Sequence, residues 1–568
     1  MKGEKVRLGI VAGAFLASLG LLGWRAFQLQ MVDAEHLLKK AQRQYYQRIT
    51  LPAKRGTIFD RRGRELAVSL RVPSLYALPP KVRDKASASR RIAAVLGIKP
   101  HELEGKLRSG RSFVWIKRHV TPRQVKQVKA LGLEGIDALP ETKRFYPHSE
   151  LAAPLIGFVG VDAQGLEGLE RAYDRWLRAP PVVMLLEKDA LGRWIYLPSG
   201  EPETQGPWDL HLTLDIKIQY TLERELKTGI IESGAKGAVG VILDPWSGEV
   251  LAMASLPSYN PNLFQRYPPR RWRNRAVAEL FEPGSLMKVF LVAAALEERL
   301  IKPQDVFFCE GGRYRVGPVV IHDVKPHRWL TVERIVQYSS NIGAAKMGSI
   351  LGPYRYYQYL RAFGFGRRTG IGLPGEERGI LRPPKTWTKV DLATLAFGQG
   401  MAATPLQLAV AFSTIANGGL LVRPYVVKEA VRRKGGERKV FRPQAKRRVI
   451  SSRTSKALLA MMKKVVSDGT GTKAAVQGYC VAGKTGTSQK FDPLTRTYSR
   501  ERFVASFVGF LPADSPRAVI LIMVDEPQRG THGGTVAAPI FRKVAEELVR
   551  YWGIPPEGQL ALLPGGAR

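Results

Sequence analysis

The sequence predicts an α+β fold, with a mostly antiparallel sheet beside a cluster of helices, a separate N-terminal region and one apolar helix at the start. Three observations support this prediction. Leu8–Trp24 is an uncharged apolar run, and short strands and turns alternate from about Gln30 to Gly206. The second half has strands at both of its ends and helices between them, so its sheet must be assembled from both ends of the domain.

Length and charge limit the classes of function. The 568 residues, of which 45% are hydrophobic, allow roughly two to four domains with large cores. The net charge of +39 suits nucleic acid, an anionic membrane surface or an acidic polymer. No helix-turn-helix, zinc-finger or RNA-reader motif accompanies it, so we expect no nucleic-acid partner, and we predict no metal and no cofactor. Cys309 and Cys480 lie in apolar surroundings and are interpreted as two buried thiols, with a disulfide as the alternative.

The N-terminal apolar run is interpreted as a membrane anchor. It is 17 residues long with basic residues on both sides, which is short for a membrane span. A cleaved signal peptide is the alternative, but no small-x-small cleavage site follows the run. We therefore predict a tail at 1–7 and an uncleaved transmembrane anchor at 8–28. Because basic residues also follow the anchor, charge alone does not decide which end of it faces the cytoplasm.

The region at 29–206 is expected to form one domain of short elements. Lys54–Gly63 predicts a strand, a tight turn and a second strand, with Gly63 at a position of positive φ. Further patterns predict helices at Arg90–Leu107, Thr121–Leu131 and Ala172–Leu177. A polar stretch with Pro and Gly, Pro198–Pro207, separates this domain from the next.

The region at 207–555 is expected to form a second domain, followed by a tail at 556–568. A helix is predicted at Ile216–Ile231, and a turn at 245–248 joins two strands into a hairpin. The remaining predicted elements are the hairpin strands Ala238–Asp244 and Glu249–Ser255, the later strands Ala474–Thr487, Phe503–Leu511 and Ala518–Val524, and an amphipathic final helix, Val536–Trp552.

Ser285 and Lys288 form an S-x-x-K motif at the start of the apolar helix Leu286–Leu296. Residues three apart share a helix face, and the helix start offers unpaired N–H groups. A serine hydroxyl needs a base to become a nucleophile, and a lysine can act as that base only if its pKa falls through burial or a nearby cation. The apolar helix could supply the burial, and Lys484 could supply the nearby cation. The alternative is a helix-capping serine beside a surface lysine.

Two further motifs follow in the chain. Ser339 and Asn341 form S-x-N after a predicted helix, Thr331–Tyr338. The hydroxyl of Ser339 could relay a proton between Lys288 and a leaving group, and Asn341 offers a donor and an acceptor to a peptide group. Taken alone this motif is weak, because helix ends favour Ser and Asn.

The third motif is K-T-G, in Gly483–Ser488, where a predicted strand ends. An extended substrate could add there as an extra strand, with Gly486 leaving room for it. Lys484 and the hydroxyls of Thr485 and Thr487 would bind a terminal carboxylate, and the N–H groups of Ser285 and Thr487 would form an oxyanion hole. A phosphate-binding loop is excluded because the upstream glycine pattern and the following helix are missing.

The three motifs in this order are typical of active-serine penicillin-binding proteins and β-lactamases. The chain resembles the class B penicillin-binding proteins over almost its whole length. Arg55–Ala67 matches the family stretch R-G-x-I-x-D-R-x-G-x-x-L-A, and Arg144–Pro147 and Gly165–Glu170 resemble other motifs of the N-terminal part. Further matches are Asn274-Arg275, Glu282–Ser285, Phe397–Gly400, Thr404–Gln407 and Ala416–Gly419.

The resemblance implies the penicillin-binding transpeptidase fold, a mostly antiparallel five-stranded sheet with helices on both sides, on an elongated pedestal domain of the dimerisation type. It implies a serine-type D-alanyl-D-alanine transpeptidase that cross-links the stem peptides of peptidoglycan, with carboxypeptidase activity as a side reaction. Ser285 would form the acyl-enzyme and β-lactams would trap it. The catalytic domain would be periplasmic, on a single-pass anchor in the inner or plasma membrane. Because no glycosyltransferase region precedes the pedestal, glycan polymerisation would need a partner enzyme.

Within this class the chain resembles the septal, cell-division enzyme more than the elongation enzyme. Its second motif is Ser-Ser-Asn where elongation enzymes often have Ser-Ser-Asp, and the run from Lys484 to Pro539 also resembles septal enzymes. A septal enzyme is expected to work with a polytopic glycan polymerase and other division proteins. Alternatives are an elongation-type transpeptidase, a β-lactam sensor or hydrolase using the same serine, and a structural division protein without activity.

Overall fold

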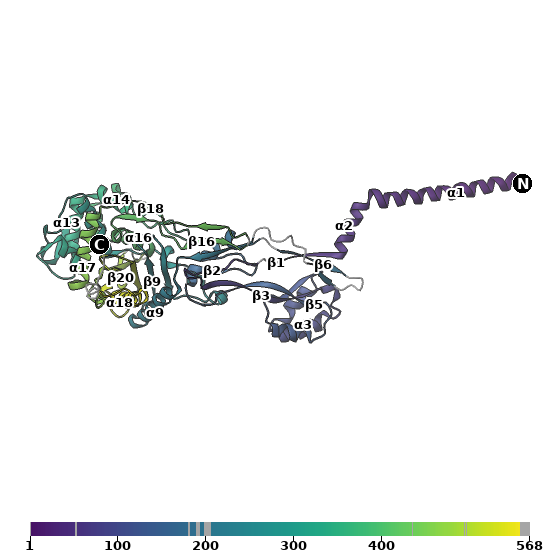
Figure 1. Ribbon diagram of the computed structural model, residues 1–568, viewed down its shortest axis with the longest axis horizontal. Coiled ribbons are helices and arrows are strands. Elements are labelled where there is room, and N and C mark those ends of the chain that lie inside the picture. The colour runs from purple at the N-terminus through teal and green to yellow at the C-terminus, as the bar shows by residue number, and fades with distance from the viewer. Residues whose placement is uncertain are drawn as a thin grey trace, which may run out of the picture. The chain divides into compact units, whose positions relative to one another are not determined.

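The computed structural model describes residues 2–51, 54–179, 182–188, 194–197, 206–433, 435–492, 495 and 497–556 (Figure 1). The chain divides into two units that are interleaved in sequence. The first unit takes its residues from Met1–Ala53, Val72–Glu141 and Ala179–Gly206. The second takes them from Lys54–Arg71, Thr142–Arg178 and Pro207–Arg568.

The first unit begins with α1 (Lys2–Phe27), which continues through a short π-helix, η1 (Gln28–Val32), into α2 (Ala34–Tyr45). In the described residues, Gly3–Val32 is the one segment long and apolar enough to cross a membrane. The predicted anchor Leu8–Trp24 lies inside it. A small three-stranded sheet in this unit consists of β1 (Tyr46–Leu51), β6 (Val182–Lys188) and β7 (Trp194–Leu197).

A second cluster of the first unit packs short helices against β4 (Val114–Lys117), which pairs with Leu75–Ala77 of β3 (Glu65–Ala77). Its helices are α3 (Lys85–Leu96), α4 (Pro100–Leu107) and α5 (Pro122–Lys129), and β5 (Ile136–Phe145) pairs with β3. The prediction of one helix at Arg90–Leu107 is wrong. Gly97 has a φ of 63° and ends α3, and the next helix begins only at Pro100.

The centre of the second unit is a fully antiparallel five-stranded sheet in the order β10-β9-β21-β20-β19. This confirms the predicted antiparallel sheet built from both ends of the domain. Its strands are β9 (Gly237–Leu243), β10 (Val250–Leu256), β19 (Ala482–Asp492), β20 (Thr497–Leu511) and β21 (Ala518–Asp525).

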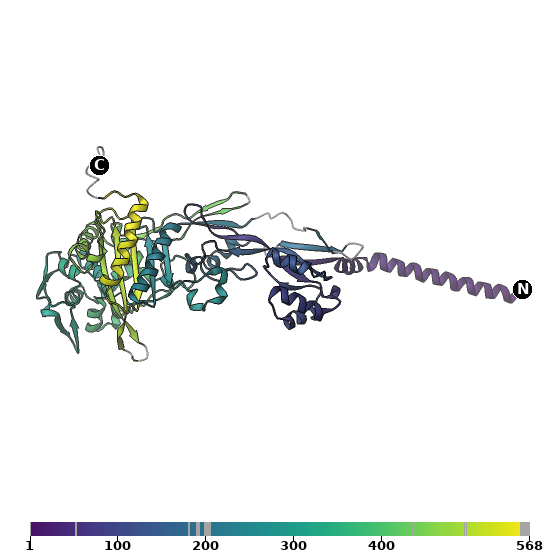
Figure 2. The same ribbon diagram turned by 90° about the horizontal axis from the view of Figure 1, so that it is seen from below.

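Helices cover both faces of this sheet, as predicted, because its strands are apolar on both sides. Along β9, Val239 and Val241 belong to one hydrophobic core, and Ala238 and Ile242 belong to the other. Two helices lie on one face, α9 (Ile216–Ser233) and α18 (Gly533–Trp552) (Figure 2). The other face packs against the cluster of α11 (Met287–Glu297), α16 (Pro405–Ala416) and α17 (Ser452–Asp468).

The other elements of the second unit surround this layered core. One further sheet contains β2 (Ile58–Phe59), the start of β3, β8 (Trp208–Leu212), β16 (Val427–Arg432) and β17 (Arg438–Val440). Two-stranded sheets pair β11 (Val306–Phe308) with β14 (Trp329–Thr331), β12 (Arg313–Val316) with β13 (Val319–His322), and β15 (Leu420–Val422) with β18 (Ala445–Arg448). The remaining α-helices are α6 (Ala153–Ile156), α7 (Gly168–Ala172), α8 (Asp174–Leu177), α10 (Arg275–Ala278), α12 (Val332–Tyr338), α13 (Asn341–Leu351), α14 (Pro353–Ala362) and α15 (Lys389–Leu395).

Most predicted elements of this unit are confirmed, and one strand begins later than predicted. The predicted strand Ala474–Thr487 is wrong in its first half, because Thr472–Ala474 is a 3-10 turn and β19 starts at Ala482. K-T-G therefore lies in the first half of β19 and does not end a strand. The predicted boundary Pro198–Pro207 lies mostly outside the described residues, as does the tail after 556. Cys309 is a buried thiol, whereas Cys480 is only half-buried, and the two form no disulfide.

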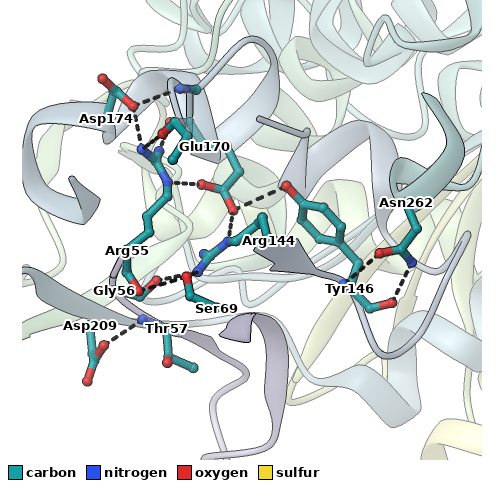
Figure 3. Close-up of polar contacts among 12 residues, drawn as sticks. Arg55, Gly56, Thr57, Ser69, Arg144, Tyr146, Glu170, Asp174, Asp209 and Asn262 are labelled. Atoms are coloured by element: carbon teal, nitrogen blue, oxygen red, sulfur yellow. Dashed lines mark hydrogen bonds and ion pairs between the residues drawn. The ribbon is translucent and has the colours of Figure 1, made fainter. Parts of the chain in front are cut away.

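Three motifs from the N-terminal half of the chain meet in the second unit around one buried carboxylate (Figure 3). Glu170 accepts hydrogen bonds from Nε of Arg55 and Nε of Arg144, each at 2.6 Å. Arg55 also donates to Asp174 at 2.5 Å, and Arg144 donates to the carbonyl oxygen of Gly56 at 2.6 Å. Because two guanidinium groups share two carboxylates, the cluster is neutral overall although it is largely removed from solvent.

Candidate active site

Ser285 lies where the chain enters the apolar helix. It is in a 3-10 turn, η5 (Gly284–Leu286), that leads directly into α11. Gly284 has a φ of 58°, and its N–H donates to the carbonyl oxygen of Gly398 at 3.2 Å. A Cβ at Gly284 would lie 2.7 Å from the carbonyl oxygen of Thr487, so the glycine lets the turn that carries Ser285 approach β19 closely.

Lys288 is fully buried one turn after Ser285, and its amine is surrounded by oxygen atoms. Nζ lies 3.1 Å from Oγ of Ser285 and 3.1 Å from Oγ of Ser339. It donates to Oδ1 of Asn341 at 2.7 Å and to the carbonyl oxygen of Ser339 at 2.5 Å. Burial lowers the pKa of Lys288 well below its ordinary value, and the charge of Lys484 lowers it further. The S-x-x-K pair thus has a base with a depressed pKa at contact distance from the serine hydroxyl.

Ser339 connects the two buried lysines. It ends α12 in the left-handed conformation, with a φ of 61°. Its Oγ lies 2.9 Å from Nζ of Lys484 as well as 3.1 Å from Nζ of Lys288. A hydroxyl between two amines can accept from one and donate to the other when the second is neutral, so the geometry suits a proton relay.

The K-T-G motif lies on β19, next to the nucleophile turn. Lys484 is fully buried, and burial lowers its pKa to about 7. The hydroxyl of Thr485 is 2.8 Å from that of Thr470, and Oγ1 of Thr487 accepts from the N–H of Gly533 at 3.1 Å. Lys484 and the two threonine hydroxyls therefore lie in neighbouring positions along one strand.

Gly486 is required by the packing of the protein itself. A Cβ there would lie 2.2 Å from Oγ of Ser506 and 2.9 Å from Cγ of Leu286. The space above this glycine is thus occupied by the neighbouring strand and by the turn that carries Ser285. The sequence prediction assigned that space to a bound ligand, so the structure gives a different reason for the glycine.

All eight predicted site residues come together: Ser285, Lys288, Ser339, Asn341, Lys484, Thr485, Gly486 and Thr487. Sequence reasoning missed Asp323, which contacts the start of α13, and Thr470, which contacts Thr485. Neither belongs to a motif, and no local pattern marks them. In the part of the chain that the structure describes, no group of His, Cys, Asp and Glu could hold a metal ion.

The arrangement supports acyl transfer through a serine. A neutral Lys288 can accept the proton of the Ser285 hydroxyl as its oxygen attacks a carbonyl carbon. Lys484 and the threonines on β19 are potential donors to a carboxylate, and Ser285 lies directly before the positive N-terminal end of α11.

Two domain families match the chain. Residues 238–546 match the model of the penicillin-binding protein transpeptidase domain, and residues 50–207 match the model of the penicillin-binding protein dimerisation domain. The chain is 34% identical over 561 residues to the peptidoglycan D,D-transpeptidase FtsI of Escherichia coli, covering 97% of this chain and 92% of the relative. It is 35% identical over 550 residues to stage V sporulation protein D of Bacillus subtilis, covering 94% of this chain and 84% of the relative.

The fold also matches a solved structure, that of penicillin-binding protein 3 from Mycobacterium tuberculosis in complex with aztreonam. The TM-score is 0.71 at 30% sequence identity, and the match covers 89% of this chain and 99% of the other.

Proposed function

The chain belongs to the class B penicillin-binding proteins and is a peptidoglycan D,D-transpeptidase, and on this premise we propose that Ser285 is its acyl-enzyme nucleophile and that it acts at the division septum. The observation that carries the first part is the distance of 3.1 Å between Oγ of Ser285 and Nζ of a fully buried Lys288.

In the proposed reaction, Lys288 removes the proton of Ser285 while Oγ attacks the carbonyl carbon between the two terminal D-alanine residues of a stem peptide. The N–H groups of Ser285 and Thr487 hold the developing oxyanion. Ser339 passes a proton from Lys288 to the leaving amine, and the terminal D-alanine departs. An amine of a second stem peptide then attacks the ester, which forms the cross-link and restores Ser285; water in its place gives the carboxypeptidase side reaction.

The other residues of the site bind substrate in this proposal. Asn341 contacts a peptide group of the donor stem. Lys484, Thr485 and Thr487 contact its terminal carboxylate, and Gly486 shapes the strand that the stem peptide lies along. β-Lactams acylate the same serine, in line with the aztreonam complex of the mycobacterial protein.

The proposed septal role rests on the Ser-Ser-Asn form of the second motif and on the likeness to FtsI. The helix α1 is proposed as a single-pass anchor in the inner or plasma membrane, with 1–7 cytoplasmic and the catalytic domain periplasmic. The pedestal at 29–206 and the transpeptidase domain at 207–555 are the proposed domains. A polytopic glycan polymerase is the proposed membrane partner, contacted through the anchor and pedestal.

Labelling with penicillin tests the nucleophile. Intact-mass spectrometry of the full-length protein should show one adduct, and the Ser285→Ala variant should show none. An adduct that persists in that variant would reassign the nucleophile.

Depletion tests the septal role. A septal enzyme builds only the cross-wall, so its loss should give long undivided cells, and the full-length protein but not a form lacking 1–28 should restore division. Rounded cells would show an elongation role and would leave the acyl-enzyme chemistry in place.

A further inference from the structure

A carboxylate outside the three motifs, Asp323, binds the start of the helix that carries Asn341. It follows β13, and both of its oxygens are engaged. Oδ1 accepts from the backbone N–H groups of Asn341 at 2.5 Å and Ile342 at 3.1 Å. Oδ2 accepts from the hydroxyl of Ser340 at 2.6 Å. The same hydroxyl oxygen accepts from the N–H of Gly343, so Ser340 and Asp323 cap α13 together.

The neighbouring residue fixes the side chain of Asn341. Its Nδ2 donates to the carbonyl oxygen of His322 at 2.8 Å. A backbone carbonyl accepts only from the NH₂ end of the amide, so Oδ1 is directed to the amine of Lys288, which lies 2.7 Å away. Residues 322–323 therefore determine both the position and the orientation of a group that touches the catalytic base.

Asp323 is also the negative charge that acts on buried Lys288. The charged groups that act on Lys288 are Lys484 on β19 and Asp323. Burial lowers the pKa of Lys288 most, and the charge of Lys484 lowers it further. The charge of Asp323 raises it and so opposes both effects. The charge of Asp323 also acts on the Cys309 thiol, as does that of Lys346, which pairs with Glu310.

We propose that Asp323 is a positioning residue of the transpeptidation reaction. Its carboxylate holds the start of α13 so that Asn341 and Ser339 present their oxygens to Lys288, and its charge acts on Lys288 without forming an ion pair with it. The inference rests on the proposed role of Lys288 as the base for Ser285.

The test is the rate of Ser285 acylation by penicillin as a function of pH, measured on the full-length protein and its Asp323→Asn variant. Asparagine keeps the size of the side chain and one acceptor oxygen but removes the charge. Acylation needs neutral Lys288, so it rises as the pH rises through the Lys288 pKa. Without the aspartate charge the ammonium form is less stable, and this rise moves to lower pH. The plateau rate falls by roughly tenfold or more, because the cap of α13 is weakened.

Ser340→Ala is the second variant, because it removes one bond to Asp323 and leaves the charge. Its plateau rate should fall while the rise with pH stays where it is in the wild type. Asp305→Asn is the matched control. Asp305 lies directly before β11, is exposed and accepts from the backbone N–H of Lys302, which is not part of α13. It should change neither quantity.

Two results overturn the inference. The first is an Asp323→Asn variant with a wild-type plateau and pH profile. The second is a uniform fall in rate with the rise at an unchanged pH, which would leave Asp323 a helix cap and nothing more. A failure of the proposed function appears separately, as labelling that survives in Ser285→Ala.

Discussion

Two pairs of buried basic residues in the second unit differ in whether a carboxylate neutralises them. Arg55 and Arg144 share the carboxylate of Glu170, and Arg55 also pairs with Asp174. Lys288 and Lys484 are equally buried, but in the described part of the chain neither forms an ion pair with a carboxylate. Instead they contact hydroxyl, amide and carbonyl oxygens.

The difference separates a structural cluster from a reactive one. Burial lowers the pKa of Arg55, but Glu170 and Asp174 more than reverse this, so the guanidinium stays charged at every physiological pH. For Lys288 burial dominates and lowers the pKa well below its ordinary value. A buried cation without a counter-ion loses its proton readily, and that property makes a lysine useful as a base.

The largest expected effect comes from replacing the unpaired lysine by a cation that cannot lose its proton. Lys288→Arg should abolish acylation of Ser285 by penicillin, because arginine is not deprotonated in a protein. Stopped-flow or gel-based labelling measures the rate, and thermal unfolding checks that the variant is folded. A rate within about tenfold of the wild type, or ~1.4 kcal/mol in barrier, would mean that another group is the base.

Next in size is the loss of the shared carboxylate in the arginine cluster. Glu170→Gln should lower the free energy of unfolding by about 3–5 kcal/mol, because it leaves two buried guanidinium groups short of a counter-charge. Urea unfolding measures this. Glu547, whose side chain is 39% exposed and pairs with Arg550, is the control, and Glu547→Gln should cost less than about 1 kcal/mol. The acylation rate per folded molecule of Glu170→Gln should stay that of the wild type; a tenfold lower rate would show that the arginine cluster takes part in the chemistry.

A third prediction concerns Lys484 and the pH dependence of stability. Its pKa is about 7 in the folded protein and near 10.5 in the unfolded chain. The unfolded chain therefore binds the proton more tightly, and the buried lysine costs stability that is fully developed below about pH 7 and vanishes above about 10.5. Lys484→Met should raise the free energy of unfolding at pH 7, and the gain should fade as the pH approaches 10.5. If Lys484→Met is less stable than the wild type at pH 7, the view that Lys484 is buried without a counter-ion is wrong.

The smallest effect is expected for Tyr146→Phe in the arginine cluster. The Tyr146 hydroxyl donates to Oε1 of Glu170 over a long 3.4 Å, and this oxygen already accepts from Arg144. Removing the hydroxyl should lower the free energy of unfolding by no more than about 1 kcal/mol. A loss comparable to that of Glu170→Gln would show that the tyrosine, and not the second arginine, satisfies the buried carboxylate.

The motif residues could be predicted from the sequence because their spacing carries the chemistry. Ser285 and Lys288 lie one helical turn apart, and the order of the three motifs identifies the family. The antiparallel sheet followed from apolar strands at both ends of the domain. Asp323 and Thr470 could not be predicted, because each reaches its partner through a tertiary contact that no local pattern records.

The two errors in element boundaries have local causes. Gly97 ends a helix whose apolar pattern continues beyond it, and the apolar residues at 474–481 form a turn before β19 begins. The packing reason for a glycine at position 486 could not be predicted either, because the atoms above it belong to Ser506 and Leu286, which are distant in the sequence.

The pH dependence of Ser285 acylation in the wild-type protein tests the central claim most directly. The claim is that Lys288, buried without a counter-ion, becomes a neutral base well below the ordinary pKa of a lysine. The second-order rate with penicillin should rise with pH and reach its plateau well below 10.5, the ordinary pKa of a lysine. A rate that keeps climbing until the pH reaches about 10.5 would contradict the claim, because it would show that Lys288 holds its proton as an exposed lysine does.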